Sequence, residues 1–268
     1  MPLPSDPRWH DGADGRRGGW RRRLAALGLV GAEPVGRAVE GERELPGTAM
    51  QHRLDPDAQG VPGWAVDAVV ASLRALAAVP GSDAMRVLPV VSENAAFRTP
   101  GDSFTEALLR LVRRRVATAG AALHKALPDL DRRLVAVGER LSAVEPVPDT
   151  VVHGDLFGAN IHLDSDGKPV AVLDFRFMTT AGDPRFDAGV TASIFDMYGA
   201  HAQQITTRLT AELADRLGHD PDVLVVYRAA YAVVTCTLFG SDEHDGHFAW
   251  CVRQLRAPDI SRVLGLAR

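Results

Sequence analysis

Lysine, cysteine and long apolar runs are all scarce in this chain of 268 residues. Only two lysines occur, Lys125 and Lys168, and every other basic side chain except histidine is arginine. The two cysteines, Cys236 and Cys251, form no CxxC pair and have no metal-ligand spacing. We therefore expect ordinary buried thiols in a reducing, cytoplasmic compartment.

Three further absences concern nucleic acid, membranes and secretion. The formal net charge is −4, whereas a protein that binds nucleic acid usually carries a basic excess, so no nucleic-acid partner is expected. The longest apolar stretch, residues 223–239, is interrupted by Arg228 and is short for a membrane span. It predicts a buried core helix, and no membrane partner is expected. The first 15 residues are polar and lack the apolar segment of a secretory signal.

Composition divides the chain into three regions. Residues 1–19 are rich in Gly, Asp, Arg and Pro, and we expect them to be poorly ordered. Residues 20–62 predict a short helix at 20–29, a pair of strands over 34–54 with a turn near Gly41, and a turn-rich linker at 55–63. From residue 63 the chain is predominantly helical, with apolar stripes that predict helices starting near Trp64, Phe104, Leu130, Asp183 and Ile205, and one more over 221–239.

Short β-like runs interrupt the helical region at 150–153, 160–163 and 170–175. The sequence DSDG at 164–167 separates the last two and predicts a hairpin turn. The same four residues resemble the start of a calcium-binding loop, but the other ligands of such a loop are missing, which favours the turn.

Oxygen-bearing side chains lie at the ends of these runs. Asp155 follows the first, Asn160 opens the second and Asp174 closes the third. Because a tight hairpin separates two strand ends, these side chains can lie within a few ångströms of each other. Carboxylate and carboxamide oxygens suit Mg²⁺, which leaves room for phosphate oxygens. An aspartate that the metal does not consume can accept a proton from a hydroxyl group.

The motif HGDLFGAN (153–160), the run AVLDF that ends at Asp174-Phe175, and AGDPRFDAGV (181–190) together resemble the aminoglycoside phosphotransferase family of kinase-like small-molecule kinases. That family shows HGDxxxxN, then a strand ending in LDF or LDW, then GDPxxD. The resemblance implies an α+β, protein-kinase-like fold. Residues 63–268 would form a mostly helical C-lobe with a catalytic hairpin, and residues 20–62 a reduced N-lobe and hinge.

The resemblance also implies a role for each matching residue. Asp155 would be the catalytic base toward a hydroxyl of a small-molecule substrate. Asn160 and Asp174 would hold Mg²⁺ on ATP or GTP. His153 and Asp187 would brace the catalytic loop without reacting.

Two further groups of residues are candidate binding positions. The first corresponds to the interlobe hinge, where backbone groups bind adenine in this fold: Met50, Gln51 and His52. The second belongs to the acidic run at 241–245, which suits a cationic substrate unless it is simply a solvated loop: Asp242, Glu243 and Asp245.

The N-terminal part of the sequence departs from the family pattern. The N-lobe of the family has several strands, a phosphate-covering loop, a strand lysine and a helix glutamate. Here only residues 1–49 precede the hinge, no lysine occurs before Lys125, and the position expected for the glutamate is close to Arg17. Arginine is not equivalent, because its planar guanidinium is not a compact point charge. The sequence therefore predicts a truncated N-lobe that clamps ATP weakly.

Three functions are compatible with this pattern. The first is a kinase that uses Mg·ATP to phosphorylate a hydroxyl of an aminoglycoside or another natural product. The second is a non-catalytic kinase-like protein or remnant, which the missing lysine favours. The third is a metal-dependent phosphoesterase, which would need histidine and aspartate ligands that the pattern lacks.

Overall fold

The computed structural model describes residues 47–268, except 56–57, 92, 241–245 and 267–268. The predicted helix at 20–29 and most of the predicted strand pair lie outside the described residues. The described part of residues 34–54 forms a two-residue strand, β1 (Thr48–Ala49), followed by a short 3₁₀ helix, η1 (Met50–Arg53).

Helices make up most of the described chain, as the sequence predicts. They are α2 (Gly63–Ala77), α3 (Asp83–Arg86), α4 (Phe104–Ala126), α5 (Leu130–Ser142), α6 (Pro184–Ile194), α7 (Ala202–Leu217), α8 (Pro221–Thr235), α9 (Gly246–Arg256) and α10 (Pro258–Val263). The helices predicted from residue 63 onward are confirmed, but α8 ends at Thr235 and not at residue 239. The chain tightens there into turns, in which Leu238 N–H donates to Thr235 O and Gly240 N–H to Thr237 O.

Side-chain caps explain where several helices begin. Ser103 and Glu106 form a capping box at α4, in which each side chain binds the other residue's backbone N–H. Asp183 caps α6 and Asp220 caps α8, and a proline follows each of them at the first helical position. Proline is favoured there because its missing N–H would have no intrahelical partner.

The strands form two small antiparallel sheets. β3 (Ile161–Leu163) lies between β1 and β4 (Pro169–Val172) in a three-stranded sheet. The predicted hairpin turn between β3 and β4 is confirmed: Asp164 Oδ1 accepts hydrogen bonds from the backbone N–H groups of Asp166 and Lys168. β2 (Thr150–Val152) pairs with β5 (Thr180–Gly182) in a separate sheet that the sequence does not predict.

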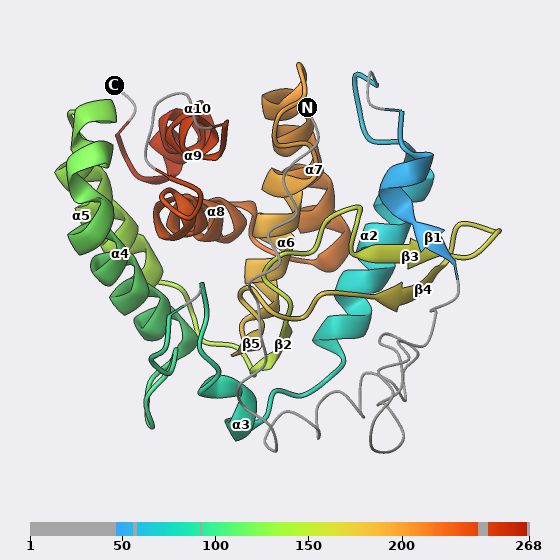
Figure 1. The fold of residues 1–268 in the computed structure, drawn as a ribbon, viewed down its shortest axis with the longest axis horizontal. Helices are drawn as coiled ribbons and strands as arrows, with labels where there is room; N and C mark the ends of the chain where they lie inside the picture. Colours follow the sequence, from blue (N-terminus) through green and yellow to red (C-terminus); the bar gives the residue numbers. More distant parts are fainter. Residues whose placement is uncertain (1–46, 56–57, 92, 241–245, 267–268) are drawn as a thin grey trace.

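The elements are arranged with the three-stranded sheet beside α2 at one side of the molecule and with α4 and α5 at the other (Figure 1). α6, α7 and α8 lie between them. One apolar core gathers around α4, α5, α8 and α9, and a second joins α2 to β3, β4 and α7. The loop after β2, which carries the HGD motif, lies where these two cores meet, because Val151 belongs to one core and Val152 to the other.

No helix in the described ranges is long and apolar enough to cross a membrane.

Candidate active site

The loop after β2 is held in place by the buried carboxylate of Asp187. Asp187, in the first turn of α6, accepts hydrogen bonds from His153 N–H at 2.8 Å and from Gly154 N–H at 2.7 Å, one on each oxygen. Burial raises the pKa of the Asp187 carboxyl to about 7, and the two N–H donors act in the opposite direction. The GDPxxD motif is therefore joined directly to the HGD motif.

The glycine of the HGD motif is required by space and by backbone conformation. Gly154 has a φ of 76°, in the left-handed region. A Cβ atom added there would lie 2.3 Å from the Cβ of Met178. No other residue fits at this position without displacing the loop that follows Asp174.

His153 links the catalytic loop to the end of β4. Its ring accepts a hydrogen bond from Asp155 N–H at Nδ1 (3.2 Å), so Nε2 carries the proton and donates to Leu173 O at 2.7 Å. The side chain is buried, and this burial lowers the pKa of the imidazole to about 4. His153 is therefore a neutral group that fixes the two segments on which Asp155 and Asp174 lie.

A pH dependence of stability follows from the buried imidazole. The folded-state pKa of His153, about 4, lies below the ordinary value of 6.5, so the unfolded chain takes up the proton first. The stabilisation is complete above pH 6.5 and is lost as the pH falls toward 4, by up to about 3 kcal/mol. We expect the difference in unfolding free energy between the wild type and His153→Gln, measured in urea, to shrink from pH 7 to pH 4.5. A constant difference would contradict this.

Asp155 is well placed to act on a proton. Its carboxyl lies in a largely buried position, and burial, together with the negative charge of Asp174, raises its pKa to about 6. A carboxylate with a pKa near the working pH is a suitable general base. Asn160 is close by, because its Nδ2 donates to Asp155 O at 2.8 Å. The structure thus brings the three predicted residues of the strand ends together.

Asn160 and Asp174 provide oxygen atoms of the type that binds Mg²⁺. The Asn160 amide nitrogen is committed to Asp155 O, which leaves the carboxamide oxygen as the group for a cation. The Asp174 side chain is 59% exposed, with Arg176 Nε 3.9 Å away. The described ranges contain no group of three or more His, Cys, Asp or Glu side chains that could hold a metal ion. Two ligands suit Mg²⁺, which keeps waters and binds phosphate oxygens.

Of the three predicted hinge residues, Gln51 contacts the catalytic loop. Met50 is fully buried in the core that contains α2, and Gln51 N–H donates to Gly158 O at 2.9 Å. A Cβ on Gly158 would come within 3.2 Å of the Gln51 Cβ, so glycine permits this close approach. His52 is exposed. Sequence reasoning missed the contact with Gly158, because nothing in the local sequence indicates it.

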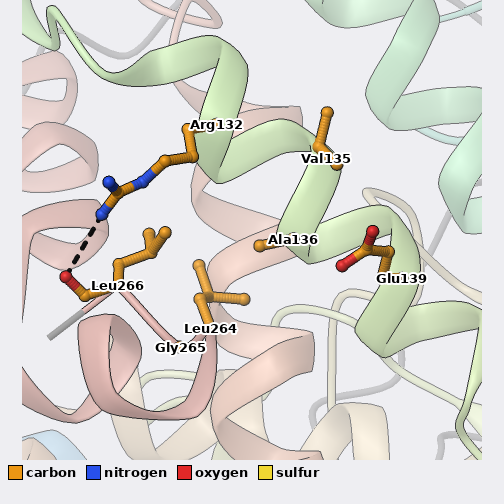
Figure 2. Close-up of a pocket in the computed structure, with 7 residues that line it drawn as sticks. All are labelled: Arg132, Val135, Ala136, Glu139, Leu264, Gly265 and Leu266. Atoms are coloured by element: carbon orange, nitrogen blue, oxygen red, sulfur yellow. Dashed lines mark hydrogen bonds between the residues drawn. The ribbon is translucent and has the colours of Figure 1, made fainter.

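The predicted substrate residues Asp242, Glu243 and Asp245 lie outside the described residues. A surface hollow of about 360 Å³ lies between α5 and the chain that follows α10 (Figure 2). Its lining includes Arg132, Glu139 and Leu266. None of the predicted site residues lines it, so it is separate from the candidate active site.

Comparisons with known proteins identify the family and the fold of the chain. Residues 8–230 match the model of the phosphotransferase enzyme family, APH. No curated protein matches the sequence.

The fold is similar to that of a thermostable mutant of aminoglycoside phosphotransferase APH(4)-Ia in complex with AMP-PNP and hygromycin B. The two sequences are 17% identical, the match covers 90% of this chain and 80% of that chain, and the TM-score is 0.64. A Plasmodium vivax ethanolamine kinase is similar at 14% identity, with coverage of 92% and 73% and a TM-score of 0.56. At such low identity the likeness shows the fold, which is kinase-like, as the sequence predicts. With a family match over most of its length, the chain belongs to the aminoglycoside phosphotransferase family of kinase-like phosphotransferases.

Proposed function

We propose that the protein transfers the γ-phosphoryl group of ATP to a hydroxyl of a small molecule in a Mg²⁺-dependent reaction. One observation carries the proposal: Asp155, a carboxyl with a pKa near 6, is tied through His153 and Asn160 to the loop that presents Asp174. Family membership supports the reaction type. The nucleotides AMP-PNP and ADP in similar structures support ATP as the donor.

Each residue has a defined part in this reaction. Asp155 accepts the proton of the attacking hydroxyl, since at neutral pH most of its carboxyl is ionised. Asn160 and Asp174 would hold Mg²⁺, which would supply the positive charge that neutralises the transferred phosphoryl group. His153 and Asp187 keep the loop in place through backbone hydrogen bonds. Because phosphoryl transfer depends on positioning and charge neutralisation, this bracing affects the rate.

The hinge and the acidic run are the proposed binding positions for the nucleotide and for the acceptor. Adenine would bind at the hinge, at residues 50–52, through backbone groups other than Gln51 N–H, which is already bonded to Gly158 O. The acidic run at 241–245, with Asp242, Glu243 and Asp245, would favour a cationic acceptor. Hygromycin B is bound in one similar structure, and another similar structure is named an ethanolamine kinase; both molecules carry amino groups.

A non-catalytic kinase-like protein is the second candidate, and the distribution of lysine favours it. Lys125 lies in the last turn of α4, on the side of the molecule away from the three-stranded sheet, and Lys168 lies at the β3–β4 hairpin. Within the 268 residues of the sequence, no lysine lies N-terminal to Lys125, so neither lysine corresponds to the strand lysine that positions the phosphates of ATP in kinases. The two candidates differ in whether the wild-type protein catalyses phosphoryl transfer.

Two measurements separate these candidates. The first is calorimetric titration with Mg·AMP-PNP. The second is an assay of ATP-dependent phosphorylation across a panel of hydroxylated amines and natural products. The proposed function requires both binding and transfer. Binding without any transfer would support the non-catalytic candidate. No binding at millimolar nucleotide would overturn the proposed function.

Removing either proposed metal ligand should weaken the Mg²⁺-dependent part of nucleotide binding. We expect Asp174→Asn and Asn160→Ala each to lower AMP-PNP affinity in Mg²⁺ by at least about 10-fold, as changes at a metal site commonly do. Affinity in EDTA should stay unchanged, because the nucleotide then makes no contact through the metal. Asp166→Asn, an exposed aspartate of the neighbouring hairpin, is the control. An equal loss in EDTA would show that these residues do not act through a metal.

A further inference from the structure

Two non-glycine residues in the described part of the chain have a positive φ, Val91 (46°) and Asp174 (58°). For a β-branched residue such as valine this conformation is a steric outlier, and it persists only where the surroundings impose it. Val91 is 1% exposed and belongs to the apolar core around α4 and α8, so core packing holds it in place. Such strained residues cluster at active sites and clamps.

The two strained residues are connected through the chain that follows Asp174. Val91 N–H donates to Phe177 O at 2.8 Å, and Arg176 N–H donates to Asp174 O at 2.9 Å. The Phe177 ring packs edge-on against Tyr231 of α8, with ring centroids 6.4 Å apart. The turn from Asp174 to Phe177 is thus held at its last residue, Phe177, by the segment that joins α3 to α4.

The same loop is fixed at both ends by His153. Nε2 of His153 donates to Leu173 O at 2.7 Å, and Thr179 Oγ1 donates to His153 O at 3.2 Å. These bonds secure the residues before Asp174 and after Phe177. In the turn between them, the buried Phe175 ring packs against the His153 imidazole with ring centroids 4.7 Å apart, whereas Asp174 and Arg176 are exposed. Val91 supplies a backbone hydrogen bond to that turn.

The segment that carries Val91 is itself attached firmly to α4. Arg114 of α4 donates to Glu93 Oε2 through Nε at 3.1 Å and through Nη2 at 2.8 Å. Glu93 N–H in turn donates to Val90 O at 3.0 Å. A continuous set of contacts therefore runs from α4 through Val91 to the turn that presents Asp174.

We propose that Val91 is a positioning residue for Asp174: its backbone N–H and its strained conformation hold the 174–177 turn so that the Asp174 carboxylate faces a Mg²⁺ ion on the nucleotide. This inference rests on the proposed function and adds a residue that the sequence motifs do not contain. It predicts that changes at Val91 affect the Mg²⁺-dependent part of nucleotide affinity selectively.

Two substitutions separate the hydrogen bond from the side chain. Val91→Pro removes the N–H and fixes φ near −65°, so it breaks the bond to Phe177 O. Val91→Gly keeps the N–H and adopts a positive φ without strain. Calorimetric titration with AMP-PNP, in Mg²⁺ and in EDTA, should show at least about a 10-fold loss in Mg²⁺ for Val91→Pro and less than about threefold for Val91→Gly. Neither variant should change the affinity for AMP-PNP in EDTA. General destabilisation of the fold would instead lower the affinity both in Mg²⁺ and in EDTA.

A third variant tests the strain even where Val91→Pro does not fold. Val91→Ala loses most of the side chain, as Val91→Gly does, but alanine is strained at a positive φ. We expect Val91→Gly to unfold at a higher temperature than Val91→Ala and to bind Mg·AMP-PNP more tightly, the reverse of the usual order of alanine and glycine.

Equal Mg·AMP-PNP affinities for Val91→Ala and Val91→Gly would overturn the inference, as would a folded Val91→Pro that binds like the wild type. Failure of the proposed function would be visible in the wild type itself, which would then show no Mg²⁺-dependent nucleotide binding. That result would overturn the proposed function together with the role of Val91.

Discussion

Asp155→Asn is expected to lower kcat for phosphoryl transfer by about 10²–10⁴-fold, the range for loss of a positioned general base. The amide has the shape of the carboxylate but cannot accept the proton of the acceptor hydroxyl. Mg·nucleotide affinity should change little, because Asn160 and Asp174 remain in place. Single-turnover phosphorylation of an acceptor identified in the panel, with nucleotide affinity measured separately by calorimetry, checks both parts.

Folding stability provides a second readout for the same variant. Burial and the charge of Asp174 raise the pKa of Asp155, so the ionised carboxylate is disfavoured in the folded protein. Replacing it with a neutral amide should therefore not lower the melting temperature at pH 7.5. Asp166→Asn, on the exposed turn, should match the wild type in rate. An Asp155→Asn variant with wild-type kcat would exclude Asp155 as the base and with it the mechanism proposed above.

Local sequence signals predict the elements of the site but not the contacts between them. The hairpin turn at Asp164 and the cap at Asp183 depend on neighbouring residues, so their side chains and the following proline or glycine are visible in the sequence. By contrast, β5 has only three residues, and all of them are buried, so the strand shows no alternation of polar and apolar side chains. The pairing of β2 with β5 is a long-range contact that periodicity does not encode.

The motif residues illustrate the same division. The spacing of His153, Asp155 and Asn160 is readable in the sequence, and in the structure the side chains of His153 and Asn160 each form a hydrogen bond with the backbone of Asp155. Their catalytic roles stay predictions. The hydrogen bond from Val91 to Phe177 comes from a segment without helical or strand periodicity, and its strain depends on packing by distant residues. Sequence patterns carry no signal for such a contact.

Arg228 shows how a residue that interrupts a sequence pattern can identify a structural constraint. It breaks the apolar run that predicts the buried helix α8, and its side chain is only 1% exposed. Its Nη2 donates to Asp259 Oδ2 at 2.5 Å, while Nε and Nη1 have no hydrogen-bond partner among the described residues. The charge of this guanidinium is therefore balanced chiefly by one carboxylate of α10.

Asp259→Ala is accordingly expected to destabilise the protein by about 3–5 kcal/mol, because it leaves a buried charge without its partner. The melting temperature should fall by roughly 10 °C for a domain of this size. Asp222→Ala is the matched control: it removes the partner of Arg262 in an exposed pair and should cost less than about 1 kcal/mol. Urea unfolding of each variant measures the difference.

The double variant Arg228→Met with Asp259→Ala distinguishes a buried charge from lost packing. Methionine fills a similar volume without a charge, and replacing a buried ion pair with apolar side chains is often neutral or stabilising. The double variant should therefore recover most of the stability that Asp259→Ala loses. If the double variant is as unstable as Asp259→Ala, the cost comes from the carboxylate's own contacts, such as the bond it accepts from Ile260 N–H, and not from the unpaired guanidinium.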